Sequence, residues 1–132
     1  MKIIPPVREH DDFGSGLYGA SRDGGKRSHN GIDLACYPGS SVCSINSGTV
    51  TKLGYPYKDA LQYRYVEVTN YHKIKFRYFY VKPSVSMNQA IVQGQILGKS
   101  QELNSKYPGI TEHVHLELKT MGNEFLDPND FI

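Results

Sequence analysis

The sequence has little of several features that would assign it to a class of protein at once. No apolar run approaches the roughly 18–20 residues that a membrane-spanning helix requires. Neither sign of charge dominates, because 15 Lys and Arg residues offset 13 Asp and Glu residues and leave a formal net charge of +2. We therefore expect neither membrane insertion nor a nucleic acid partner.

The chain also lacks the signs of a secreted, disulfide-linked protein. Its start, Met-Lys-Ile-Ile-Pro-Pro, carries a positive charge but no apolar segment of the kind found in a signal peptide. We therefore expect it to be made in the cytoplasm and to leave, if it leaves, by a signal-independent route. Its two cysteines, Cys36 and Cys43, flank a Tyr-Pro-Gly-Ser turn, where a hairpin would allow a bridge. Free thiols in a reducing compartment are the preferred interpretation.

The length and the residue pattern predict one small β domain. A chain of 132 residues suits a single domain over residues 1–132 and can bury roughly two-thirds of its unfolded surface, so it needs no metal merely to fold. Gly and Pro recur, and alternating apolar segments fill the gaps between them, as in short strands joined by turns. We predict an all-β fold, an antiparallel sheet or sandwich with long loops. The expected strands are Ile32–Cys36, Ser41–Ile45, Gly48–Leu53, Tyr63–Thr69, Ile74–Val81, Ala90–Leu97 and His113–Lys119.

Two segments do not fit the strand pattern. Asp11–Asn30 is rich in glycine, has no periodicity and runs directly into a histidine, which favours a functional loop. Gln101–Ser105 allows a helical turn or two, and no other segment shows a sustained helical period.

The most informative strand contains two histidines in alternation. Because successive side chains of a strand point to opposite faces, His113, His115 and Glu117 share one face and the apolar residues between them share the other. The two imidazoles then stand roughly 6–7 Å apart at the backbone, so that one can bind a metal while the other reaches the metal's water. On its own, such a pair is more often two surface histidines on a half-exposed strand.

A second motif changes that balance. His29 and Asp33 form an HxxxD, in which Gly31 gives the backbone freedom to turn into the strand. One imidazole and one carboxylate from this motif, together with one imidazole from the HxH, make a three-ligand set with a fourth position for water, which is the arrangement of catalytic zinc. The remaining histidines, His10 and His72, lie in polar surroundings and are assigned no role.

These motifs resemble those of the M23 (LytM/lysostaphin-like) zinc metallopeptidases over most of the chain. The family cleaves short peptide cross-links of bacterial peptidoglycan with one zinc ion. The resemblance implies Zn²⁺ held by His29, Asp33 and His115, with His113 as the general base. The matching stretches are Phe13-Gly14 with Arg22, Lys26–Leu34, Pro38–Val42, Ser47–Val50, Gln93–Gly98 and His113–Glu117.

One position departs from the family pattern. Catalytic members have a second histidine in a YxH strand, and Tyr80 stands at the matching place. A phenol can donate a hydrogen bond to an oxyanion, but with an ordinary pKa of about 10 it cannot act as a base near neutral pH. If Tyr80 instead belongs to the aromatic stripe of Phe76 and Tyr78, it serves packing alone. The segments Phe79–Pro83 and Lys106–Ile110 are similar to a secreted signalling branch of the family that has no established peptidase activity.

The resemblance therefore leaves two functions open. The first is a zinc metalloendopeptidase acting on peptidoglycan peptides at the bacterial cell wall, such as a bacteriophage lysin or virion-associated enzyme, with His113 and Tyr80 as catalytic residues. The alternative is a catalytically weak or inactive zinc-binding recognition protein. A metal-free β module with incidental histidines is a third, simpler reading, which elemental analysis would reject. The sequence does not specify an oligomeric state.

Overall fold

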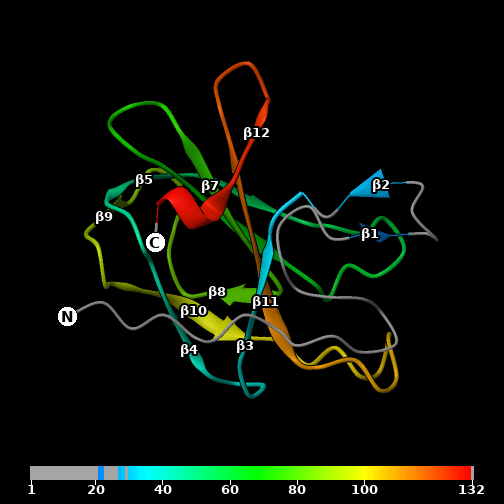
Figure 1. Ribbon diagram of the computed structural model, residues 1–132. Helices are drawn as coiled ribbons and strands as arrows, with labels where there is room; N and C mark the ends of the chain where they lie inside the picture. The colour runs from blue at the N-terminus through cyan, green and yellow to red at the C-terminus, as the bar shows by residue number, and fades with distance from the viewer. Residues whose placement is uncertain (1–20, 23–26, 29, 132) are drawn as a thin grey trace.

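The computed structural model describes residues 21–22, 27–28 and 30–131, and this part of the chain is almost entirely β-structure (Figure 1). Its only helix is a short 3₁₀ turn, η2 (Pro128–Asp130), and no helix within it is long and apolar enough to cross a membrane. The prediction of an all-β fold is confirmed. The strands are β1 (Ser21–Arg22), β2 (Arg27–Ser28), β3 (Ile32–Ala35), β4 (Ser41–Cys43), β5 (Gly48–Gly54), β6 (Tyr65–Thr69), β7 (Lys75–Phe79), β8 (Val81–Pro83), β9 (Ala90–Ile91), β10 (Ile96–Ser100), β11 (His113–Lys119) and β12 (Phe125–Leu126).

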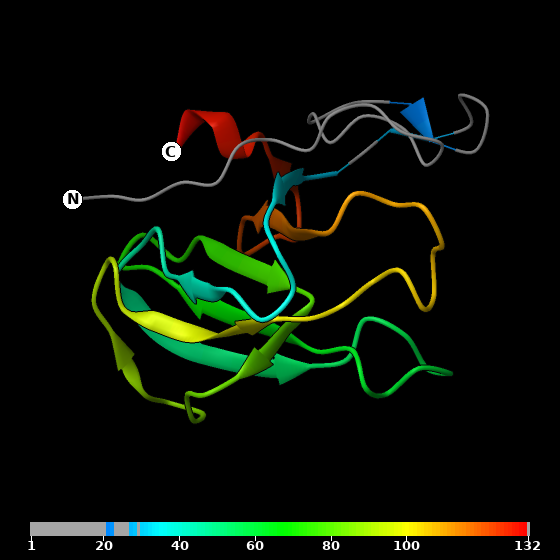
Figure 2. The same cartoon turned by 90° about the horizontal axis from the view of Figure 1, so that it is seen from below.

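Most of the strands form two antiparallel sheets. The larger has the order β12-β11-β7-β6-β5-β9, and β3 pairs with the first half of β11. The smaller, β4-β10-β8, lies against one face of the larger sheet, as Figure 2 shows. Strands β1 and β2 form a separate two-stranded ladder. The chain passes from the large sheet to the small one between β7 and β8.

The main core lies between the two sheets and follows the alternation of each strand. In β11 the apolar residues between the histidines are buried, as the sequence predicts. Fully burying one such side chain contributes about 1.5–3 kcal/mol, so the inward face of each strand is strongly specified. The core residues include Val50, Val66, Val68, Phe76, Tyr78, Leu116 and Leu118 from the large sheet, and Val81 and Leu97 from the small sheet.

Two expected strands are each divided in the structure. Ala90–Leu97 is interrupted by a turn in which Gln95 N donates to the carbonyl of Val92, and Gly94 takes a φ of +91°. The pieces on either side belong to different sheets. Ile74–Val81 is interrupted at Tyr80, whose φ is +69°. Near Gln101–Ser105 the chain forms one helical turn, closed by Tyr107 N donating to the carbonyl of Leu103.

The two cysteines are free thiols, as the preferred interpretation expects. Cys36 follows β3 and Cys43 ends β4. Burial is the main influence on Cys36 and raises the pKa of its thiol. Because the thiolate is the reactive form, Cys36 is poorly suited to act as a nucleophile.

A buried ion pair joins three neighbouring strands of the large sheet. Glu67 on β6 accepts hydrogen bonds from Thr51 Oγ1 on β5 over 2.8 Å and from Arg77 Nε on β7 over 2.7 Å. Burial alone would raise the pKa of Glu67, but the hydrogen bonds from Arg77 and Thr51 and the charges of Arg77 and Lys75 outweigh it and lower the pKa. The carboxylate therefore contributes stability above its unfolded-state pKa, and this stability is lost as the pH falls through the folded-state pKa.

Replacing this carboxylate tests the contribution. We expect Glu67→Gln to lower the free energy of unfolding by about 1–3 kcal/mol at neutral pH, because a charged hydrogen-bond acceptor is lost. The deficit should shrink below a pH of about 4, where the wild-type carboxyl also takes up a proton. Urea denaturation at both pH values measures it, with Glu124→Gln in an exposed loop as the control. An equal deficit at both pH values would contradict this account.

Candidate functional site

The pairing of β3 with β11 builds the centre of the site. Its register sets Asp33 directly opposite His115 and Leu34 opposite Val114. Since neighbouring residues of a strand face opposite ways, the apolar pair points into the core while Asp33 and His115 point to the other side of the sheet. His113 lies two residues before His115 and shares its face. The two sequence motifs are thus brought together by backbone pairing.

The carboxylate of Asp33 lies between the two imidazoles. Its Oδ1 is 2.8 Å from His115 Nδ1, and its Oδ2 is 3.5 Å from His113 Nε2. Asp33 is 3% exposed and His113 is 4% exposed. A carboxylate oxygen and an imidazole nitrogen at hydrogen-bond distance are chemically suited to share a proton or to ligate one cation.

His115 is held from both sides. Its Nε2 lies 3.0 Å from Glu117 Oε1, while its Nδ1 faces Asp33. Burial alone would lower the pKa of His115, but the hydrogen bonds to Asp33 and Glu117 outweigh it and raise the pKa to about 9. Glu117 fixes the orientation of the ring by binding the nitrogen that Asp33 does not. The sequence left Glu117 open between this role and that of a solvated glutamate, and its contact with His115 agrees with the first.

The tautomer of His113 follows from its second contact. Its Nδ1 is 2.7 Å from the carbonyl oxygen of Thr111. Because a carbonyl oxygen can only accept, Nδ1 carries the proton, and the basic nitrogen of the neutral ring is Nε2, which faces Asp33. The nitrogen of His113 that can take up a proton therefore lies on the side of the same carboxylate that contacts His115.

Tyr80 lies beside His113 because the strand breaks there. Its backbone has a φ of +69°, an unusual value for a bulky residue. The carbonyl of Arg64 holds this conformation by accepting from both Tyr80 N and Val81 N, while Gln101 N donates to the carbonyl of Tyr80. The break turns the ring away from the aromatic stripe of the main core and sets it edge-on to His113, with 5.7 Å between the ring centroids.

The phenol of Tyr80 remains protonated at neutral pH. Burial is the main cause of a pKa raised to about 12, and the negative charges of Asp33 and Glu117 contribute to the rise. The hydrogen bond with Tyr57 acts in the opposite direction but does not outweigh burial. Tyr80 is therefore available as a hydrogen-bond donor and not as a base, consistent with its ordinary chemistry.

Gly31 has a role that differs from the expected backbone freedom. A Cβ at this position would lie 2.2 Å from the carbonyl oxygen of Leu116 and 2.9 Å from Cε1 of His115. The absence of a side chain thus allows the chain entering β3 to pack directly on the backbone of β11 and on the imidazole. The sequence marks the glycine, but not the close approach that requires it.

The described residues contain part of the predicted site. Asp33, His113, His115 and Tyr80 lie together, while His29, His10 and the Phe13-Gly14 segment lie outside the described residues. Within the described ranges, no three His, Cys, Asp or Glu side chains form a group able to hold a metal ion. His72 is exposed in the turn between β6 and β7, as expected. Sequence reasoning missed Thr111 and Tyr57, which come from loops without a motif, and gave Tyr107 in the segment Lys106–Ile110 no role at the site.

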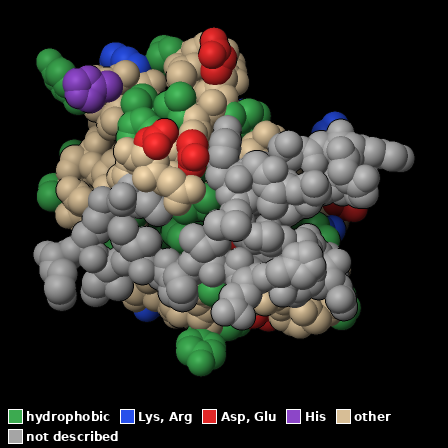
Figure 3. All heavy atoms as spheres, viewed as in Figure 1, with side chains coloured by type: hydrophobic (Ala, Val, Ile, Leu, Met, Phe, Trp, Pro, Cys, Tyr) green, Lys and Arg blue, Asp and Glu red, His purple; other side chains and the backbone are tan. Residues whose placement is uncertain are grey.

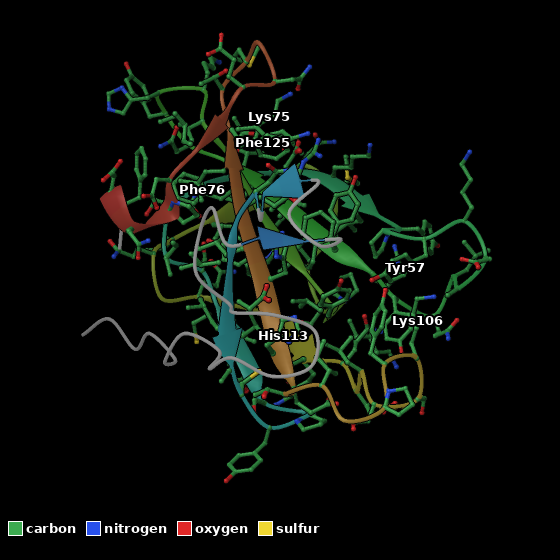
Figure 4. All side chains as sticks on the ribbon, turned by 45° about the vertical axis from the view of Figure 1, so that its right-hand side comes forward. Tyr57, Lys75, Phe76, Lys106, His113 and Phe125 are labelled. Carbon is green, nitrogen blue, oxygen red and sulfur yellow. The ribbon has the colours of Figure 1, made fainter. Side chains whose placement is uncertain are left out.

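In the described part of the face shown in Figure 3, acidic and basic side chains are dispersed and neither sign covers a broad area. Figure 4 places His113 on β11 close to the loops that contain Tyr57 and Lys106.

The fold is that of a lysostaphin-type peptidase domain. The catalytic domain of lysostaphin from Staphylococcus simulans is similar with a TM-score of 0.65 and 21% identity, covering 97% of this chain and 86% of that one. A zinc-containing peptidase from Vibrio cholerae is similar with a TM-score of 0.62 and 22% identity, covering 95% of this chain and 35% of that one. At these identities the likeness shows the fold.

The chain belongs to peptidase family M23, whose profile matches residues 27–128. Bovine leukocyte cell-derived chemotaxin-2 is 31% identical over 116 residues, covering 84% of this chain and 72% of that protein. The resemblance to this family inferred from the motifs is confirmed, and it includes a sequence similarity to leukocyte cell-derived chemotaxin-2.

A substitution at Gly31 tests the packing of β3 on β11. We expect Gly31→Ala to lower the free energy of unfolding by about 3 kcal/mol or more, because the added methyl group meets backbone that cannot move aside. Gly122→Ala is the control, since a Cβ there meets only Thr120 Oγ1 at 3.8 Å. Thermal unfolding of both variants measures the difference. Equal stability of the two would show that the turn before β3 can move away from His115.

Proposed function

We propose that this protein is a zinc-dependent endopeptidase that cleaves the peptide cross-links of bacterial peptidoglycan. The observation that carries the proposal is the orientation of His113, whose basic Nε2 faces the Asp33 carboxylate while Asp33 contacts His115. Membership of peptidase family M23 supports the same reaction class. Such an enzyme acts at the bacterial cell wall, as a bacteriophage lysin or a virion-associated protein.

The described donor atoms fit a zinc ion. Asp33 Oδ1 and His115 Nδ1 are one carboxylate and one imidazole on directly opposed strand positions, and Glu117 orients the imidazole through its other nitrogen. His29, four residues before Asp33, would complete the set of three. Zinc, when bound, supplies a Lewis acid that polarises a peptide carbonyl and lowers the pKa of water.

His113 would move the protons of the reaction. Its Nε2 accepts a proton from the water that attacks the peptide carbonyl, while the Thr111 carbonyl stabilises the proton that remains on Nδ1. The imidazolium then donates the Nε2 proton to the leaving amine as the C–N bond breaks. One water is consumed, and a carboxyl group and an amino group are produced.

Tyr80 would donate a hydrogen bond as negative charge develops on the carbonyl oxygen. Its raised pKa keeps the phenolic proton in place for this purpose. A preorganised donor aimed at a developing oxyanion typically contributes about 10²–10³ in turnover, so Tyr80 supplies part of what a second histidine would supply.

Digestion of purified cell walls tests the reaction. Zinc-loaded protein should release new amino groups from sacculi, and His113→Ala should abolish this release because it removes the proposed proton acceptor. His72→Ala, which changes an exposed histidine in a distant turn, should retain full activity. Absence of cleavage across walls of different peptide chemistry, with zinc demonstrably bound, would reject the enzyme.

Elemental analysis tests the metal site separately. We expect about one zinc per chain, lost in His29→Ala and in Asp33→Ala and retained in His72→Ala. Chelation should lower the melting temperature of the wild type, because a bound metal stabilises the folded state. Zinc content that is unchanged in both ligand variants would place the metal elsewhere.

A second candidate is a zinc-binding recognition protein without peptidase activity. Tyr80 at the place of a catalytic histidine favours it, as does the similarity to leukocyte cell-derived chemotaxin-2. It predicts bound zinc and no hydrolysis even in Tyr80→His. Cleavage gained in that variant would instead identify a peptidase domain that lost its activity at this one position.

A further inference from the structure

Three phenols form a hydrogen-bonded row that ends beside His113. Tyr107 Oη donates to Tyr57 Oη over 2.8 Å, and Tyr57 Oη lies 2.7 Å from Tyr80 Oη. The rings of Tyr57 and Tyr80 are stacked, with centroids 6.2 Å apart and planes 20° from parallel. Tyr80 in turn stands edge-on to His113. The row therefore connects two loops to the proton acceptor of the site.

The first two phenols lie on two loops that contact each other. Tyr57 lies between β5 and β6, where Lys106 Nζ sits 4.5 Å from its ring centroid, and Figure 4 shows these two side chains next to each other. Tyr107 lies between β10 and β11. The carboxylate of Glu112, immediately before β11, accepts from the backbone N–H groups of Leu103 and Asn104 and ties this loop to the strand of the histidines.

Counting protons limits how the row can be arranged. Each phenol has one proton and can accept through its oxygen. The proton of Tyr107 lies on the contact with Tyr57, so the contact between Tyr57 and Tyr80 holds the proton of one or the other. A hydroxyl that accepts a hydrogen bond becomes a stronger donor, which favours Tyr57 as the donor to Tyr80.

We propose that Tyr57 and Tyr107 are positioning residues that direct the row from Tyr107 through Tyr57 to Tyr80. Tyr80 then accepts at its oxygen and keeps its own proton for the carbonyl oxygen of a bound peptide. The same polarisation makes Tyr80 a stronger donor. The inference rests on the proposed function, since it assigns Tyr80 as the donor of that site. It explains why two tyrosines from separate loops meet at a residue that replaces a histidine.

Neutron diffraction from a deuterium-exchanged crystal of the wild type tests the direction without any reaction. We expect the deuterium between Tyr57 and Tyr80 to be bonded to Tyr57. A deuterium bonded to Tyr80 at that contact would overturn the proposal, because the donor would then be occupied. The position of this deuterium can be determined even if the protein cleaves no cell wall. In that case the proposed function would be rejected separately from the direction of the row.

Kinetics of wall digestion test the consequence. Tyr57→Phe and Tyr107→Phe should each lower kcat about three- to tenfold with KM unchanged, since the loss concerns a donor used in the transition state. Neither should lower kcat further in a Tyr80→Phe background. Tyr63→Phe is the matched control, because this ring packs edge-on against Tyr57 and Tyr80 but is no member of the row. Losses that persist in the Tyr80→Phe background would overturn the proposal.

Discussion

The pairing of β3 with β11 is the constraint on which the site depends. It sets Asp33 opposite His115 at one ladder position, while the residues on either side fill the core. A slip of one residue would exchange the two faces and place a carboxylate in the core. Core packing therefore fixes the register of the two strands, and this register holds Asp33 opposite His115. Gly31 adds a second constraint, because only a residue without a side chain fits against His115 there.

The second feature that builds the site is the break at Tyr80, where a strained backbone conformation determines the position of one side chain. A positive φ at a bulky residue costs about 1–3 kcal/mol and persists only where its surroundings determine it. Here the carbonyl of Arg64 accepts from two successive N–H groups, and Gln101 N binds the carbonyl of Tyr80. The strain moves the ring from the packed face of β7 to the neighbourhood of His113. The histidines and the phenol therefore meet because β11 is a regular strand, while its neighbour β7 is interrupted at Tyr80.

Local sequence patterns predicted the fold and part of the site. Alternation predicted both faces of β11 correctly, since burial acts on every second residue of a strand. The interruption at Tyr80 was missed because it is fixed by the Arg64 carbonyl, which no pattern in 74–81 reveals. The row of Tyr57 and Tyr107 was missed for a related reason, since loops with no periodicity bring these residues together. The proximity of Asp33 to His115 was expected from the family motifs, and the strand register supplies its physical cause.

The break at Tyr80 also bears on which residues this position can hold. The chain crosses from one sheet to the other at this residue, so one backbone break serves both the layered architecture and the position of the side chain beside His113. Histidine is among the residues that tolerate a positive φ more readily than most. An exchange between tyrosine and histidine, which have neighbouring codons, therefore leaves the crossing between the layers intact. The sandwich thus determines where this side chain stands, but not which of these two residues stands there.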